Sequence, residues 1–460
     1  MFKNWFNRQA RELAQSAARY GDKFRARASL DADARRVLDE AALAYHRAEP
    51  PGKMENVPTK AMVTPFDLSL AYSPGVAEPC RAIAADPAAS AVYTNRANTV
   101  AVISNGTAVL GLGDIGALAA KPVMEGKAAL FRKFAGLNAV DLCIDEKDPE
   151  RLARAIIALE PTFGGVNLED ICAPACFEVE TRCRGAMRIP VFHDDQHGTA
   201  VCVLAAVTNA LALAGKELKG AKIVTSGAGA AAMACIDLLV AAGAQMKNIT
   251  LTDRDGVIYK GRKEGMDPRK IRYAKASKAR TLADIIPDTD VFLGLSVGGV
   301  LSPEMAGSMA QRPIIFALAN PDPEIWPEDA RAAAPDAIIA TGRTDYPNQV
   351  NNVLCFPFLF RGALDCRAWT VTDGMKVAAS KAIARLAGQP TPDLVRGLYP
   401  DESLSFGTDY ILPKAFDPRL LPEVAVAVAR AAEDDGVADK PISDYSAYRH
   451  DLEAISSAAS

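Results

Sequence analysis

The sequence predicts an α/β protein with two domains, each built around a mostly parallel sheet. Short apolar runs alternate with helical patterns over roughly three hundred residues after the linker at Pro50–Gly52, and such alternation is typical of parallel sheets covered by helices. A glycine-rich turn, Gly227–Gly229, directly follows one of these runs, which indicates that the second domain is a Rossmann-type dinucleotide-binding domain. The 460 residues, 49% of them apolar, suffice for two such cores.

Each strand is expected at a short apolar run, and each long helix at a run with helical spacing. The strands of the first sheet are expected at residues 100–103, 140–144, 163–168 and 189–192. Those of the second sheet are expected at residues 223–225, 249–252, 291–293, 314–318 and 337–340. Helices are expected at residues 199–214, between the two sheets, and at residues 376–387 and 422–432, which fold back over the first domain.

These elements divide the chain into four expected parts. Residues 37–198 form the substrate and metal domain, residues 199–365 the dinucleotide-binding domain, and residues 366–460 a set of C-terminal helices. Residues 1–36 form a helical extension rich in Lys and Arg. A mitochondrial-type presequence has a similar composition, but acids such as Glu12 argue for a plain structural helix, so a cytoplasmic location is expected.

Composition excludes several classes of partner. A net charge of −4 gives no reason to expect a nucleic acid or an anionic membrane. The nine cysteines show no paired CxxC spacing, which is typical of reduced thiols in a cytosol-like compartment. The longest apolar run, Val201–Ala214, is too short for a membrane span and indicates a buried helix.

Two pairs of acids directly follow expected strands of the first sheet. Glu169 and Asp170 come after one apolar run, and Asp194 and Asp195 come after the next. Carboxylates gathered at neighbouring strand ends need a counter-ion, and a hard divalent cation such as Mg²⁺ or Mn²⁺ takes oxygen ligands. The alternative is that these acids cap helices, which Asp often does after a strand.

The second sheet opens with a nucleotide signal. Backbone N–H groups at such a turn and helix start meet a pyrophosphate. The expected coenzyme contacts are Gly227, Ala228, Gly229, Ala230 and Ala231. The next strand ends at Asp253, where an acid normally accepts ribose hydroxyls, and Arg254 follows at once and suits a 2′-phosphate. The alternative is an ordinary strand, turn and helix whose glycines serve packing.

Two further residues are candidates for proton transfer. Tyr72 stands at the start of a segment made rigid by Pro74 and Pro79, which holds the phenol at a fixed point. Lys127 stands at the expected start of an apolar helix, where burial and a nearby metal ion would lower its pKa and suit it to act as a general base. Taken singly, a core tyrosine and a solvent-exposed lysine are the alternatives.

His193 and His197 have the i, i+4 spacing of zinc ligands on a helix. A zinc hydrolase would also need a glutamate between them, and the sequence has none there. The surrounding acids offer oxygen ligands only. The zinc interpretation is therefore kept as an alternative to the hard-cation site.

Seven motifs in order along the chain resemble those of the bacterial malic enzymes. They are Tyr72–Pro79, Gly111–Gly116, Lys121–Lys127, Asn167–Asp170, Phe192–Thr199, Ala319–Glu324 and Pro347–Asn352. The resemblance runs from about residue 40 to about residue 445. The chain is most similar to the subgroup in which this region is fused to a phosphate-acetyltransferase-like domain, which is absent from a chain that stops at Ser460.

The resemblance implies oxidative decarboxylation of L-malate to pyruvate and CO₂, with NADP or NAD as coenzyme and a weak preference for NADP. It assigns the metal ion to Glu169, Asp170 and Asp195. It makes Lys127 the base that removes the hydroxyl proton, with Asp194 orienting that lysine. Tyr72, Asn320 and Asn352 are the implied remaining residues. Tyr72 protonates C3, Asn352 holds substrate, and Asn320 contacts both substrate and the nicotinamide side.

Some features depart from the family pattern. Ala108 stands where larger malic enzymes carry an arginine for a malate carboxylate, and Lys121 is a candidate replacement. Ala175 replaces a Glu that is not a ligand. A malolactic-type or oxaloacetate-decarboxylating enzyme and a non-catalytic metabolite sensor are the alternative functions. A homodimer or higher homo-oligomer is expected.

Overall fold

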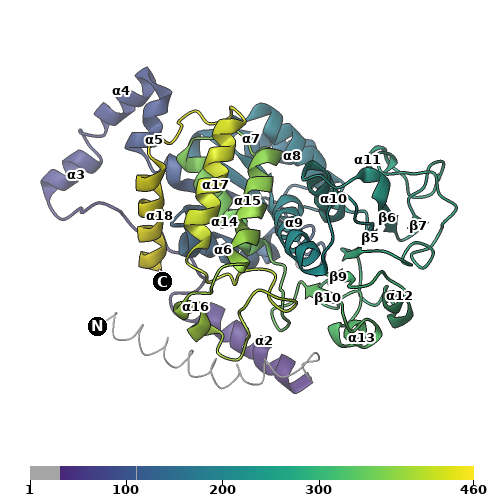
Figure 1. Cartoon of the computed structure of the whole chain (residues 1–460). Coiled ribbons are helices and arrows are strands. Elements are labelled where there is room, and N and C mark those ends of the chain that lie inside the picture. Colours follow the sequence, from purple (N-terminus) through teal and green to yellow (C-terminus); the bar gives the residue numbers. More distant parts are fainter. Residues whose placement is uncertain (1–31, 110, 460) are drawn as a thin grey trace.

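Two sheets, each covered by helices, make up the body of the protein (Figure 1). The computed structural model describes residues 32–109 and 111–459. Parallel pairs dominate both sheets, so the predicted α/β class with two sheets is confirmed. The helical extension predicted for residues 1–36 lies almost entirely outside the described residues.

The first sheet has four parallel strands in the order β2-β1-β3-β4. Its strands are β1 Thr99–Ser104, β2 Asn138–Cys143, β3 Gly165–Leu168 and β4 Val191–His193. All four were predicted to within about two residues. The central strands β1 and β3 are buried along their whole length, as expected of a parallel sheet covered on both faces.

The second sheet has six strands in the order β10-β9-β8-β5-β6-β7. They are β5 Ile223–Ser226, β6 Ile249–Asp253, β7 Gly256–Val257, β8 Val291–Gly294, β9 Ile314–Ala317 and β10 Ile338–Thr341. The chain reverses direction across the sheet between β5 and β8, which is the switch point of a Rossmann-type domain. The antiparallel strand β7 was not predicted, because two residues are too few to show a period.

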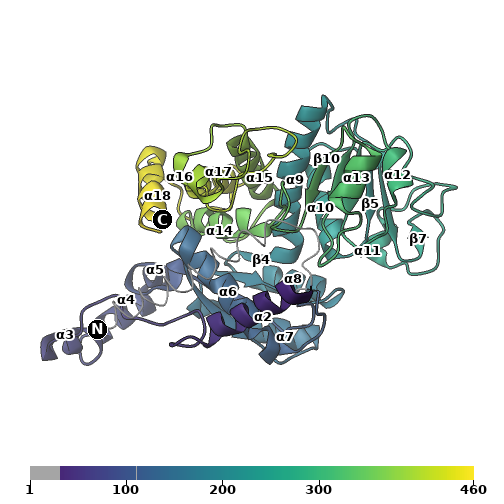
Figure 2. The ribbon, with the colours of Figure 1, turned by 90° about the horizontal axis from the view of Figure 1, so that it is seen from below.

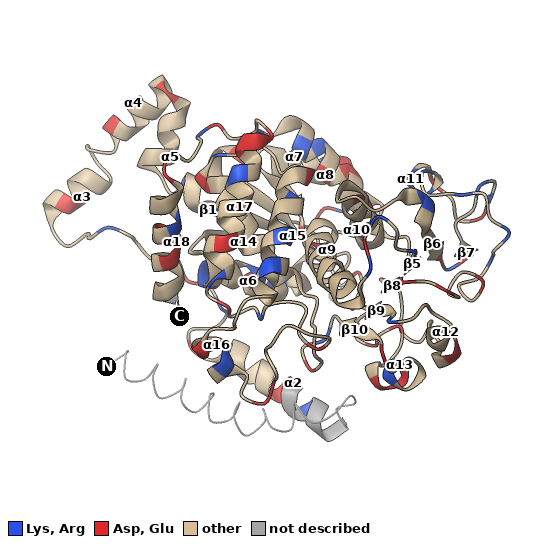
Figure 3. Ribbon diagram, in the orientation of Figure 1, with Lys and Arg blue, Asp and Glu red and all other residues tan. Residues whose placement is uncertain are grey.

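Helices cover both faces of the two sheets. Those of the first sheet are α6 Ala117–Ala135, α7 Pro149–Ile157 and α8 Ala175–Ala186, and those of the second are α10 Ala230–Ala241, α11 Pro268–Ile271, α12 Pro303–Gly307 and α13 Pro327–Ala333. Single 3₁₀ turns are η1 Pro87–Ala89, η2 Arg96–Asn98, η3 Glu160–Thr162, η4 Met246–Asn248 and η5 Asn352–Leu354. Acidic and basic residues are interspersed over these helices (Figure 3).

Helix α9, Asp194–Ala214, runs between the two sheets. It is long and apolar enough to cross a membrane, so the expectation that this segment is too short for a span is wrong for the whole helix. Most of its apolar stretch is buried inside the protein, as the sequence predicts. It begins five residues earlier than the predicted start at residue 199. The acids after β4 therefore lie in its first turn, where the helix dipole favours negative charge.

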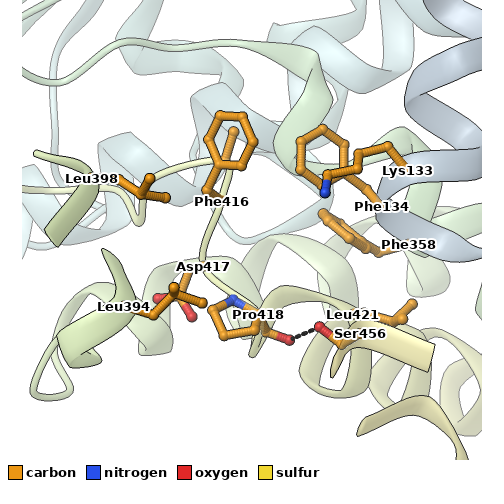
Figure 4. A pocket seen from close by; sticks show the side chains of 11 residues that line it. Lys133, Phe134, Phe358, Leu394, Leu398, Phe416, Asp417, Pro418, Leu421 and Ser456 are labelled. Carbon is orange, nitrogen blue, oxygen red and sulfur yellow. Dashed lines mark hydrogen bonds between the residues drawn. The ribbon is translucent and has the colours of Figure 1, made fainter. Parts of the chain in front are cut away.

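The C-terminal helices pack back on the first sheet's helices. They are α14 Phe356–Asp365, α15 Asp373–Ala387, α16 Asp393–Leu398, α17 Leu420–Asp434 and α18 Tyr445–Ala459. Helices α14 and α18 both contact α6, and the ring of Phe131 meets those of Phe356 and Phe360 edge-on. A mainly apolar cavity of about 190 Å³ remains between α6 and the C-terminal helices, with the Ser456 hydroxyl donating to the carbonyl of Pro418 at 2.9 Å (Figure 4).

The segment before the first sheet projects from the body as an arm, which we define as residues 57–93 (Figures 1 and 2). Helix α2, Ala32–Arg47, precedes it, and the arm contains α3 Pro65–Ala71, α4 Ala77–Ala85 and α5 Ser90–Tyr93. None of the residues in these three helices of the arm is buried. The arm therefore exposes large apolar side chains, such as those of Phe66 and Val63.

Candidate functional site

Three carboxylates meet where the first sheet's strands end. Ligand oxygens of Glu169, Asp170 and Asp195 all lie within 4.8 Å of one another. Strands β3 and β4 are parallel neighbours with Leu168 paired to His193, so the residues that follow them emerge at the same edge. The prediction from the sequence that these three acids lie close together is therefore confirmed.

The carboxylate cluster suits a hard divalent cation. Two of its members are tied to their surroundings: Asp195 accepts a hydrogen bond from the Asp170 backbone at 2.9 Å, and Glu169 accepts one from the Asn167 amide at 2.9 Å. Burial raises the pKa of Glu169 to about 7 and that of Asp195 to about 6, and a neighbouring carboxylate raises each pKa further. Both effects disfavour the charged carboxylates, and a bound cation would offset them. An oxygen-only donor set of this kind fits Mg²⁺ or Mn²⁺.

The zinc alternative finds no support in the described part of the chain. There the carboxylate cluster alone brings three ligand atoms of His, Cys, Asp or Glu this close together. His197 shares a hydrogen bond with Glu180 at 2.8 Å. The Asp-rich neighbourhood thus belongs to a site of a different kind from the zinc site considered above.

Lys127 connects the carboxylate cluster to Asp194. Its Nζ lies 2.6 Å from an oxygen of Asp194 and 2.9 Å from one of Glu169, and its side chain is buried over the ring of Phe356 at 4.2 Å from the centroid. The prediction that Lys127 stands at a helix start is wrong. It lies in the middle of α6, which begins at Ala117 and runs through Pro122, a residue that normally ends helices.

The pKa of Lys127 is raised, contrary to the expectation from the sequence. Burial acts to lower it, but the negative charges of Asp194 and Glu169 outweigh burial. Burial raises the pKa of Asp194 to about 6, because it disfavours the charged carboxylate more than the nearby Lys127 stabilises it. A cation bound by Glu169 would compete for that carboxylate's charge and shift the pKa of the lysine downward.

Asn352 joins the same group from η5. Its side-chain amide donates to the Asp194 oxygen that also accepts from Lys127. Asp194 is fully buried, so these two donors fix its carboxylate in one orientation. The structure thus brings together Lys127, Asp194 and Asn352, all of which were predicted site residues.

Tyr72 lies outside this group. It caps α3 on the arm, 72% of its surface is exposed, and its side chain has no partner among the described residues. The turn behind it is tightly built, because a side-chain carbon on Gly75 would come within 2.7 Å of the Ser69 carbonyl. The predicted rigidity of the segment is thus seen, but within one chain the phenol does not reach Lys127.

The glycine turn after β5 has the form that a pyrophosphate requires. Gly227 has φ +112°, and a side-chain carbon there would come within 2.4 Å of the Leu295 carbonyl, so only glycine fits. Gly229, by contrast, faces open space at the start of α10. Ala228, Ala230 and Ala231 complete the turn and the first residues of the helix. The backbone N–H groups of this helix start are available to an anion.

Asp253 has both carboxylate oxygens engaged by groups of the protein. It accepts from Arg262 at 2.6 and 2.7 Å, from Lys270 at 2.6 Å and from the backbone of Asp255 at 2.9 Å. Despite partial burial, these partners lower its pKa. The side chain of Arg254 is 90% exposed, beside Asp255.

Two other predicted residues have local partners. Asn320, after β9, is exposed, with its amide at 3.5 Å from the Leu318 carbonyl and no link to Lys127. Lys121, the candidate for a malate carboxylate, instead forms an ion pair with Asp141. The roles of Asn320 as a coenzyme and substrate contact stay predictions.

Sequence reasoning missed several residues that shape the site. Asn167 stands between two apolar residues of β3 and orients Glu169. Phe356 carries no signal of its own, since apolar residues surround it. Lys270 lies 17 residues beyond Asp253 and could have been noticed as a cation following the acid.

The fold and the site define an α/β protein with a carboxylate cluster beside a buried lysine and, on its second sheet, a dinucleotide-type glycine turn. Residues 51–184 match the malic enzyme N-terminal domain, and residues 196–403 match the malic enzyme NAD-binding domain. An NADP-dependent malic enzyme of Halomonas elongata is 53% identical over 402 residues, 87% of this chain and 95% of the relative. The chain belongs to the malic enzyme family.

Other comparisons agree with this membership. An NAD-dependent malic enzyme of Rhizobium meliloti is 59% identical over 89% of this chain, but the chain spans only 53% of that relative's length. The crystal structure of malic enzyme from Pyrococcus horikoshii superposes with a TM-score of 0.84 at 39% identity, covering 91% of this chain and 96% of that one. Relatives named for each coenzyme are thus similarly close to the chain.

Proposed function

We propose that the chain catalyses the oxidative decarboxylation of L-malate to pyruvate and CO₂, with NAD(P)⁺ as coenzyme and a divalent cation at the carboxylate cluster. The observation that carries this proposal is the position of Lys127, whose Nζ lies between Asp194 and a member of that cluster, Glu169. A hydroxy acid held at the cation would thus present its hydroxyl beside a buried base.

The residues of the chain divide the proton transfers between them. The bound coenzyme supplies the hydride acceptor and the cation supplies Lewis acidity toward the hydroxyl and the later enolate. Lys127 takes the hydroxyl proton as the C2 hydride leaves, while Asp194 and Asn352 keep its Nζ in place. After the C3–C4 bond breaks and CO₂ departs, Tyr72 gives its phenolic proton to C3.

Tyr72 can perform that step only if it enters a site from outside its own chain. We infer that the protein acts as a homodimer in which the arm of one copy, residues 57–93, docks on the other and brings Tyr72 to its Lys127. Nearly half of the large exposed apolar side chains of the described chain lie on this arm, including Phe66, Leu68 and Leu70. Such a surface is typical of a protein interface.

Mixing two inactive variants tests this arrangement. If Tyr72 acts across the interface, Tyr72→Phe and Lys127→Ala chains, unfolded together and refolded as mixed dimers, contain one intact site per mixed dimer. Random pairing then restores about a quarter of the wild-type activity. A mixture as inactive as either variant alone would place Tyr72 in its own chain's site.

We also propose NADP as the preferred coenzyme. Asp253 as positioned has no free oxygen lone pair for ribose hydroxyls, because its carboxylate already accepts four hydrogen bonds, from Arg262, Lys270 and the backbone of Asp255. These two cations also offset the negative charge that would repel a 2′-phosphate, and the exposed Arg254 is free to approach one.

We propose the cytoplasm as the location of the protein. The free cysteines of the chain support this proposal, because thiols stay reduced in that compartment.

A single assay tests the proposed reaction. The protein is incubated with L-malate, Mn²⁺ and each coenzyme in turn. Reduced coenzyme, measured by its absorbance at 340 nm, and pyruvate should form in equal amounts. Lactate without net coenzyme reduction would indicate the malolactic reaction instead.

A further inference from the structure

A cavity of about 400 Å³ lies between the helices of the two sheets, apart from the carboxylate cluster. One wall is α8 of the first sheet, and the opposite wall is α10 and α11 of the second. Helix α15 and the first turn of α9 close it. Its size is in the range of small-molecule sites.

The walls carry an unusual density of charged groups for a junction between helices. Lys376 of α15 is buried, with its Nζ 2.7 Å from Asp373 and 3.4 Å from His197. Glu180 of α8 is buried and holds His197 at 2.8 Å. Burying such groups costs free energy, and apolar residues would join these helices at less cost.

Cations exceed carboxylates around this cavity. The carboxylates each have a partner: Glu180 has His197, Asp373 has Lys376, and Asp237 is paired with Arg272. Two more arginines line the cavity, Arg184 on α8 and Arg269 on α11. In all, four side chains that are cationic at neutral pH, those of Arg184, Arg269, Arg272 and Lys376, face three carboxylates.

Arg269 is the cation without a carboxylate. Among the described residues it makes no ion pair, and its guanidinium stacks on the ring of Phe177 at 4.1 Å from the centroid. The stacking leaves the guanidinium edge and its N–H donors open to a ligand. Arg184, which also lines the cavity, is 4.0 Å from Glu180 and donates to the carbonyl of Val371 at 3.0 Å.

The cavity connects to the candidate catalytic site through one helix turn. Gln196 and His197 line the cavity from the first turn of α9, which also carries Asp194 and Asp195. A ligand bound to the cavity face of this turn therefore contacts the element that positions both the partner of Lys127 and a cluster carboxylate. The ligand would also bridge α8 to α11, and so fix how the two sheets lie relative to each other.

We propose that this cavity binds a small organic phosphate, held by Arg269 and Arg184, and that its occupancy modulates turnover at the candidate catalytic site. Guanidinium groups recognise phosphate oxygens through paired N–H donors, and a second anionic end of the ligand can reach Lys376. Coupling of this kind requires only that the ligand binds one arrangement of the two sheets better than another.

Calorimetric titration of the whole chain tests the binding step. 3-Phosphoglycerate is the probe, inorganic phosphate is the smaller comparison, and Mg²⁺ and saturating NADP⁺ are present so that the glycine turn is occupied. We expect one saturable site per chain. Arg269→Gln should weaken binding about tenfold or more, the effect of losing hydrogen bonds to a charged group.

Arg182→Gln is the matched control, because Arg182 lies on the same helix α8 but pairs outward with Glu178 at 2.8 Å. This variant should bind like wild type, and unchanged melting temperatures should show that both variants fold. Unchanged affinity in Arg269→Gln, or the absence of saturable binding, would each overturn the proposal. Saturable binding that appears only when NADP⁺ is left out would place the probe at the glycine turn and would also overturn it.

The modulating step has its own readout. Saturating 3-phosphoglycerate should change the turnover number or the malate KM of wild type and of Arg182→Gln, but not of Arg269→Gln. An equal effect on all three would contradict the coupling. Should the chain fail to turn over malate, the proposed function fails, while the titration still decides whether the cavity is a phosphate site.

Discussion

Lys127 and Asp194 form a buried ion pair with 2.6 Å between Nζ and Oδ2, although 67 residues separate them in the sequence. They lie on different helices, α6 and α9, and Asn352 supports the pair from a third element. An ion pair with so little solvent around it is sensitive to the loss of either partner.

Replacing Lys127 by Ala should abolish coenzyme reduction by malate. The hydroxyl proton then has no acceptor, and Asp194 loses its cation. Asp194, whose pKa is raised to about 6, can take up a proton in response, so the protein should still fold. Stopped-flow absorbance at 340 nm measures the hydride step, and circular dichroism checks the fold. A normal burst of reduced coenzyme would remove Lys127 from the role of base.

Replacing Asp195 by Asn should leave the fold intact and eliminate turnover. An amide supplies no negative charge to a hard cation. Mn²⁺ that binds only the folded wild type raises its melting temperature by mass action, and this rise should vanish in Asp195→Asn. Near-normal activity of the variant in saturating Mg²⁺ would contradict the assignment of Asp195 as a ligand.

Replacing Tyr72 by Phe should lower overall turnover sharply while hydride transfer survives better. The phenol is assigned to protonation of C3, which follows the redox step. Its exposed position on the arm means that the variant should be as stable as wild type in its monomeric form. Incorporation of solvent deuterium at C3 of pyruvate is the measurement, and incorporation at the wild-type rate would refute the acid role.

Replacing Arg254 by Ser should weaken NADPH binding by roughly 1.5 to 3 kcal/mol, the range for a hydrogen bond to a charged group. NADH binding should hardly change, because it offers no 2′-phosphate. Fluorescence titration with both reduced coenzymes provides the comparison. Equal losses for both would make Arg254 a structural residue. No loss would transfer the phosphate to another cation, such as Lys270, or point to NAD.

Two alanine substitutions in the glycine turn should have different effects. Gly227→Ala forces a side chain into a positive-φ position against the Leu295 carbonyl, and should lower stability by about 1 kcal/mol or more. Gly229→Ala meets open space with an ordinary φ of −87° and should keep the melting temperature while reducing coenzyme affinity. Equal melting temperatures for both variants would contradict the strained turn.

The sequence by itself determined the positions of the strands and the gathering of the three acids. Apolar runs mark buried parallel strands locally, and neighbouring parallel strands must end at the same edge, so Glu169, Asp170 and Asp195 could be placed together without coordinates. The glycine turn was also predictable, since the positive φ of Gly227 is a local property of the turn that favours glycine.

Only the tertiary structure decided which partners the side chains meet. Lys127 acquired a raised pKa because α6 packs its middle, not its start, against the first turn of α9. The carboxylate of Asp253 is fully hydrogen-bonded because Arg262, in the loop after β7, and Lys270, on α11, fold back onto it. Tyr72 lies outside the site because it belongs to the projecting arm. Such contacts join residues far apart in the chain, so they depend on how whole elements pack, which the spacing of residues along one element does not specify.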